Sequence, residues 1–141
     1  MKTAKWMLAM MVTLLPGLAA AQLTSSQTVV AKVPFEFVTA NKVVPAGQVT
    51  VQTLNMGSKT LVIRNVGARA AALSNSMTVE TRQPAANCAL IFHKYGNQYF
   101  LTEVKVEGDR TSYRMPESKA EAELQAQNLP VAETTLLASL R

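Results

Sequence analysis

The chain has 141 residues, with 14 lysines and arginines against 9 aspartates and glutamates, and a net charge of +5. This length fits one domain. The basic residues are scattered, with no run of four or more like charges, whereas a nucleic-acid-binding surface needs a clustered basic face. The composition therefore predicts no nucleic-acid partner.

The first 21 residues have the pattern of a secretory signal peptide. Lys2 and Lys5 precede an apolar run at residues 6–15, and small residues up to Ala21 provide a cleavage site. As a helix rising about 1.5 Å per residue, the run is too short for a bilayer core of about 30 Å. The alternative is an uncleaved N-terminal anchor. We predict a signal peptide at residues 1–21, a periplasmic or extracellular location, and no membrane span in the mature chain.

The only cysteine, Cys88, stands at the head of an apolar run. An exported chain with one cysteine forms no internal disulfide, so its fold depends on the hydrophobic core. A free cysteine in an apolar setting is typical of a buried, inert thiol. The sequence therefore predicts a buried Cys88.

Residues 22–141 read as a succession of short strands. In residues 29–38 apolar side chains alternate with polar ones, which is the period of a half-buried strand. Pro34 donates no hydrogen bond, so this strand should lie at an edge or contain a bulge. Residues 41–48 contain Pro45 and Gly47 and are expected to form a turn. Residues 48–54 and 59–65 are rich in β-branched residues and predict a hairpin.

Two further stretches predict strands. Residues 69–82 should form a strand interrupted near residues 74–75. The segments on either side of Gly96 and Asn97 should form a hairpin, because glycine suits the first central position of a type II′ turn. That register pairs Phe92 with Leu101, His93 with Phe100 and Ile91 with Thr102.

One segment near the C-terminus predicts a helix. Pro116 suits a first helical turn, and Ser118 with Glu121 has capping-box spacing. Its apolar face is thin, with Ala120 and Leu124, so the helix must dock on the sheet. Residues 131–140 alternate and favour a final strand, with a second helix as the alternative. The predicted fold is one mainly β domain, residues 22–141: an antiparallel β-sandwich or barrel of about eight strands with one short C-terminal helix.

His93 is the only histidine and the first candidate for chemistry. The nearest nucleophile, Cys88, precedes it by an odd number of residues, which places the two side chains on opposite faces of a strand. The chain has too few cysteines and histidines for a structural zinc site. It also lacks a glycine-rich phosphate loop. We predict no enzyme activity, no catalytic or metal-binding residues and no cofactor.

The candidate binding residues are His93, Tyr95 and Tyr99, which surround the predicted turn. Tyrosines combine a large apolar ring with a polar end, so they suit stacking on a sugar or anchoring a protein. The alternative is that they support the hairpin and cover the edge of the core.

Several stretches together resemble an uncharacterised family of short exported bacterial proteins. The resemblance covers residues 29–141 and rests on VPFEF (33–37), VPAG (44–47), LVIRN (61–65), LIFHKYGNQYFL (90–101) and RMPESKAEAEL (114–124). It implies export and a mostly β domain, and it transfers no catalytic residue. It also implies that His93, Tyr95 and Gly96 belong to one hairpin signature.

We interpret the chain as an exported, non-catalytic binding domain whose partner is a protein or glycan of the cell envelope. The first alternative is a small extracytoplasmic hydrolase acting on polysaccharide or cell wall. The second is a structural envelope subunit that assembles through its sheet edges. A hydrolase needs a cleft with converging polar groups, a binder needs an exposed apolar patch, and an assembling subunit needs an unprotected edge strand.

Overall fold

The computed structural model describes residues 27–55 and 58–141, so the signal-peptide prediction lies outside the described residues. These described residues form eleven strands and one helix. They are β1 Val29–Val33, β2 Phe37–Thr39, β3 Lys42–Val44, β4 Gly47–Thr53, β5 Thr60–Asn65, β6 Ala70–Asn75, β7 Met77–Glu80, β8 Cys88–Tyr95, β9 Gln98–Lys105, β10 Thr111–Arg114, α1 Lys119–Ala126 and β11 Val131–Leu140.

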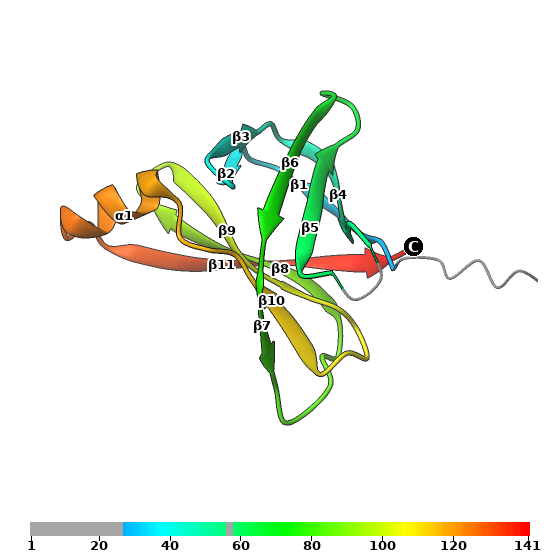
Figure 1. The fold of residues 1–141 in the computed structure, drawn as a ribbon. Helices are drawn as coiled ribbons and strands as arrows, with labels where there is room; N and C mark the ends of the chain where they lie inside the picture. Colours follow the sequence, from blue (N-terminus) through cyan, green and yellow to red (C-terminus); the bar gives the residue numbers. More distant parts are fainter. Residues whose placement is uncertain (1–26, 56–57) are drawn as a thin grey trace, which may run out of the picture.

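The strands form one strongly curved sheet in the order β3-β2-β9-β8-β11-β1-β4-β5-β6. β10 pairs with β7 and β9 beside this path, and all neighbours are antiparallel except β2 and β9. The end strands β3 and β6 approach each other, so the sheet nearly closes into a barrel (Figure 1). A mainly β domain with one short C-terminal helix is confirmed, in its barrel form.

The core lies inside this barrel. Phe37, Phe92, Ile63 and Leu90 are almost fully buried there, and Cys88 is buried among them as predicted. The alternating pattern of residues 29–38 is confirmed, although Pro34 divides the stretch into β1 and β2 because proline cannot continue the ladder.

One turn prediction is wrong. Residues 41–48 were expected to form a turn, but they contain the whole of β3 and the start of β4. The chain reverses earlier, at Ala40 and Asn41, which both have positive φ angles of 50° and 59°. Two positive φ angles in succession are typical of a type I′ hairpin turn. The β-branched residues that follow then extend as β3.

The hairpin of β8 and β9 has the predicted two-residue turn. Tyr95 pairs with Gln98, and the predicted partners Phe92–Leu101 and His93–Phe100 are confirmed. The predicted pairing of Ile91 with Thr102 is wrong, because Ile91 pairs with Glu103. Thr102 is the extra residue of a bulge, and its Oγ1 donates to the Ile91 carbonyl at 3.0 Å.

Most of the remaining local predictions agree with the structure, but Pro116 lies before the N-cap residue Ser118 rather than in the first helical turn. The stretch at residues 69–82 breaks into β6 and β7 at Ser76, whose side chain donates to the Lys59 carbonyl at 2.6 Å. Residues 131–140 form a strand. The short helix α1 begins after Ser118. Within the described part of the chain, no helix has the length and apolar character that crossing a membrane requires.

Gly96 offers a test of the hairpin turn. Its φ angle is 59°, and an added Cβ would meet no atom within 4 Å, so a larger residue there meets backbone strain without a clash. We expect Gly96→Val to lower the free energy of unfolding by about 1–3 kcal/mol. Thermal unfolding should show a midpoint lowered by several degrees. Gly67→Val is the control, because Gly67 lacks a positive φ angle; equal shifts in both variants would contradict the prediction.

Candidate functional site

The hairpin of β8 and β9 presents the three candidate residues on two different faces. His93 and Tyr95 share the outer face with Phe100, which pairs with His93. Tyr99 pairs with Lys94 and therefore lies on the opposite face, toward the core. The three candidates consequently do not form one site.

Tyr99 is half-buried and supports the end of the core. Its ring stacks on Phe35 with centroids 3.7 Å apart. The Lys94 ammonium group lies 5.4 Å from the centre of the same ring, within cation–π range. The Tyr99 ring therefore already has two neighbours within the chain.

On the outer face, His93 and Tyr95 hold the helix α1 through Glu121. The Oε1 atom of Glu121 lies 3.0 Å from His93 Nδ1 and accepts a hydrogen bond from the Tyr95 hydroxyl at 3.1 Å. Gln125, one turn later, donates to the same hydroxyl at 3.0 Å. The Glu121 side chain is only 6% exposed. These bonds connect the hairpin to a segment nearly thirty residues later.

The start of the helix directs Glu121 toward the hairpin. The Ser118 side chain accepts a hydrogen bond from the Glu121 amide at 3.1 Å, which confirms the predicted N-cap. The carboxylate of Glu121 bonds to the hairpin rather than completing a capping box. The helix docks on the sheet as predicted, but chiefly through Glu121, the buried residue of α1; Leu124 is half-buried and Ala120 is exposed.

Tyr95 is buried, with 3% of its surface exposed. Burial raises the pKa of its hydroxyl above the usual value near 10. The hydrogen bond from Gln125 acts in the opposite direction, and the nearby Glu121 raises the pKa further. His93 is half-buried, with a side chain 34% exposed, and Gln125 is exposed.

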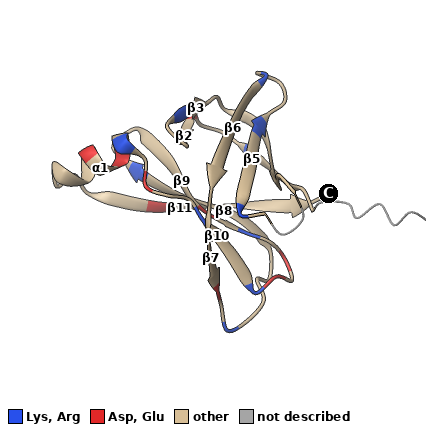
Figure 2. Ribbon diagram, viewed as in Figure 1, with Lys and Arg blue, Asp and Glu red and all other residues tan. Residues whose placement is uncertain are grey.

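A polar pocket of about 300 Å³ adjoins this cluster. Carboxylates are its most frequent lining groups, and Figure 2 shows acidic segments on α1 and on the neighbouring part of β11. The charged and titratable lining residues are His93, Glu103, Arg114, Glu117, Glu121 and Glu133. The only hydroxyl group of the lining, that of Thr102, already donates to a backbone carbonyl. Among residues 27–55 and 58–141, no group of three or more acidic, histidine or cysteine side chains could hold a metal ion.

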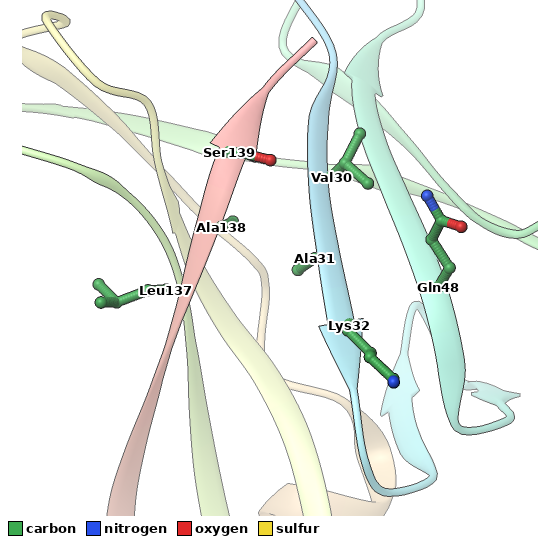
Figure 3. Close-up of a pocket in the computed structure, with 7 residues that line it drawn as sticks. All are labelled: Val30, Ala31, Lys32, Gln48, Leu137, Ala138 and Ser139. Carbon is green, nitrogen blue, oxygen red and sulfur yellow. The ribbon is translucent and has the colours of Figure 1, made fainter.

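A second pocket, of about 590 Å³, lies where β11 separates from β1. The two strands pair only at Val29–Leu140 and Val30–Ser139. Figure 3 shows them diverging below Ser139, so that on this side of β1 no strand lies beside the backbone at Ala31 and Lys32, which both line the pocket. Sequence reasoning missed this feature.

The alternation of the ladder identifies which backbone groups of β11 border the gap. Tyr95 and Gln98 flank a two-residue turn and form a hydrogen-bonded pair. The backbone N–H and C=O groups of odd-numbered β8 residues therefore point to β9, and those of even-numbered β8 residues point to β11. Even-numbered residues of β11 therefore bond to β8. The backbone N–H and C=O groups of odd-numbered β11 residues point away from β8, toward the side on which β1 lies. The hydrogen bond from the Arg141 amide to the Thr28 carbonyl agrees with this direction.

From Val131 to Leu137, this second side of β11 has no strand beside it within the described ranges. Leu137 is 72% exposed and Val131 is 54% exposed. The segment is about 20 Å long at roughly 3.3 Å per residue. We call residues 131–137 the free edge. Val131 and Leu137 alternate in step with the polar Glu133 and Thr135, which is a sequence signal for apolar side chains on the outer face, but the lack of a neighbouring strand leaves no such signal.

Comparison with models of protein families, with curated proteins and with solved structures gave no match. The resemblance to short exported bacterial proteins therefore stays a prediction, as do binding roles for His93, Tyr95 and Tyr99.

Replacing Glu121 tests whether the cluster holds α1 in place. Glu121→Ala leaves the buried Tyr95 hydroxyl without one partner and removes the contact to His93, so we expect a loss of about 1–3 kcal/mol in the free energy of unfolding. Hydrogen exchange of the α1 amides should accelerate. Glu123→Ala, at an exposed position of the same helix, should change stability by no more than about 0.5 kcal/mol. Equal effects of the two substitutions would show that Glu121 does not anchor the helix.

The raised pKa of Tyr95 predicts a loss of stability in alkali. The folded protein holds the phenolic proton more tightly than the unfolded chain, so the stabilisation is complete below the unfolded pKa near 10. It is lost as the pH rises through the folded pKa. Urea unfolding between pH 8 and 11.5 should therefore show a smaller alkaline loss for Tyr95→Phe than for the wild type. Tyr113→Phe is a useful comparison, because burial also raises the pKa of Tyr113. Parallel pH profiles for the wild type and Tyr95→Phe would refute the prediction.

Proposed function

We propose that the chain is an exported, non-catalytic binding domain, working in the periplasm or outside the cell. Its ligand is an extended segment of polypeptide, which adds to the free edge as a further strand. The observation that carries the proposal is the free edge itself, a run of backbone donors and acceptors with no neighbouring strand in the described chain.

Strand addition uses main-chain hydrogen bonds for affinity and alternate side chains for specificity. The amide and carbonyl groups of Glu133 and Thr135 lie on the outward side of β11, in the middle of the free edge. The exposed Leu137 and Val131 supply apolar contacts at its two ends. A segment bound there would bury apolar surface that is otherwise exposed.

The gap beside β1 extends this surface. Ala31, Ala138 and Leu137 line it with apolar atoms, while Lys32 and Gln48 add polar groups. A strand lying along β11 would place some of its side chains against this pocket. The pocket therefore supports a polypeptide ligand better than a flat edge alone would.

The polar pocket supports the hydrolase alternative less well. The contact of His93 with Glu121 resembles a base and its orienting acid. However, Glu121 is shared with Tyr95, and the only lining hydroxyl is engaged at the β9 bulge. We infer that this cluster positions α1, and we assign binding to the free edge.

A proline at the free edge tests the proposal. Thr135 points its amide away from β8, so Thr135→Pro removes an outward donor while leaving the internal ladder intact. Random extended peptides displayed on phage would be selected on the wild-type protein and then tested on this variant. We expect their affinity to fall at least tenfold. Hydrogen exchange with bound peptide should protect the Glu133 and Leu137 amides.

Tyr99→Ala is the matched control for this experiment. Tyr99 lies on the hairpin, away from the free edge, and peptide binding should be unchanged in a folded Tyr99→Ala variant. Selected peptides that bind wild type and Thr135→Pro equally, or that lose binding only in Tyr99→Ala, would reject the free edge as the binding surface.

A further inference from the structure

We propose that the strand added at the free edge is the free edge of a second copy of this chain, in antiparallel orientation. This inference rests on the proposed function, since it names the partner of the same surface. It follows from the sequence of the free edge, whose pattern of apolar and polar residues is the same when read in either direction.

The free edge reads Val-Ala-Glu-Thr-Thr-Leu-Leu. Two apolar residues stand at each end, and three polar residues stand in the middle. The pattern is therefore symmetric about Thr134, the central residue. A two-fold axis perpendicular to the sheet at Thr134 would pair the segment with itself along its whole length.

In this register each apolar residue lies opposite an apolar residue of the second copy, and each polar residue lies opposite a polar one. Val131 lies opposite Leu137 of the second copy, and Ala132 lies opposite Leu136. The two apolar side chains that are most exposed on the free edge, 54% for Val131 and 72% for Leu137, would cover each other. Cross-strand apolar pairs of this kind stabilise antiparallel sheets.

The register also suits the hydrogen bonds and the charge. The odd-numbered residues, whose backbone N–H and C=O groups point away from β8, lie opposite odd-numbered residues of the second copy. Hydrogen-bonded pairs of an antiparallel ladder require this match. Glu133 lies opposite Thr135, so the two carboxylates avoid the directly opposite position where like charges destabilise a sheet. Thr134 meets Thr134 in a non-hydrogen-bonded pair.

The ends of the free edge fix this register. At one end β1 pairs with Ser139 and Leu140, which excludes a second strand there. At the other end Pro130 and the turn after α1 terminate the strand. A shift of the register would leave part of one free edge opposite β1 of the other copy or beyond the end of β11.

Cysteine cross-linking tests the register directly. At the proposed axis, the two Thr134 Cα atoms would lie about 4.5 Å apart, within the range for a disulfide. Two Ala132 Cα atoms would lie about 13 Å apart along the strands. Mild oxidation should therefore convert Thr134→Cys, but not Ala132→Cys, into a covalent dimer. Cys88 is buried and stays in both variants. Equal cross-linking of both variants, or of neither, would overturn the proposed register.

Sedimentation equilibrium of the purified protein tests association without cross-linking. We expect a reversible dimer whose Kd rises at least tenfold in Leu137→Glu and in Thr135→Pro, because each substitution occurs twice in a two-fold interface. Leu73→Glu, at an exposed position of the end strand β6, should leave the Kd unchanged. Circular dichroism confirms that each variant is folded.

A wild-type protein that stays monomeric up to millimolar concentration would overturn the self-pairing. So would a dimer that persists in Thr135→Pro and Leu137→Glu. Neither result decides the proposed function, because the peptide selection measures strand addition separately. A monomer that binds extended peptides in a Thr135-dependent way would retain strand addition and exclude the second copy as the partner.

Discussion

The pairing of β11 with β8 is the constraint on which the rest of the molecule depends. This ladder runs from Val131–Tyr95 to Ala138–Cys88, and β11 then reaches β1 by two residue pairs. It therefore connects the sheet half that contains the β8–β9 hairpin to the half formed by β1, β4, β5 and β6. The free edge arises because β11 pairs with β8 along most of its length but with β1 only at Ser139 and Leu140.

The helix α1 is held on the sheet by the polar contacts of Glu121, whereas a surface helix usually docks through an apolar face. A buried carboxylate is costly unless hydrogen bonds satisfy it, and Glu121 receives them from Tyr95 and at His93. Such contacts are directional, so they fix the orientation of α1 on the outer face of the hairpin. That orientation also sets the direction in which the chain enters β11 at Val131.

Features that depend on neighbouring residues could be predicted from the sequence. The Gly96 turn, the Ser118 cap and the alternation in residues 29–38 each have a local cause. The role of Glu121 could not be predicted, because its partners lie far away in sequence and its spacing from Ser118 fits a capping box equally well. The free edge could not be predicted either, since it depends on where β1 diverges from β11. That divergence is a property of the whole curved sheet.

The pairing of Val29 with Leu140 joins the first and last described strands. Contacts between such distant residues require the closure of a very long loop, which is entropically costly and slows folding. β1, β4, β5 and β6 precede β8 along the chain, yet in the hydrogen-bonded order of the sheet they join the β8–β9 hairpin only through β11, the last described strand. The two halves of the sheet therefore become continuous only once β11 has paired on both sides, which makes the docking of this strand a late event in folding.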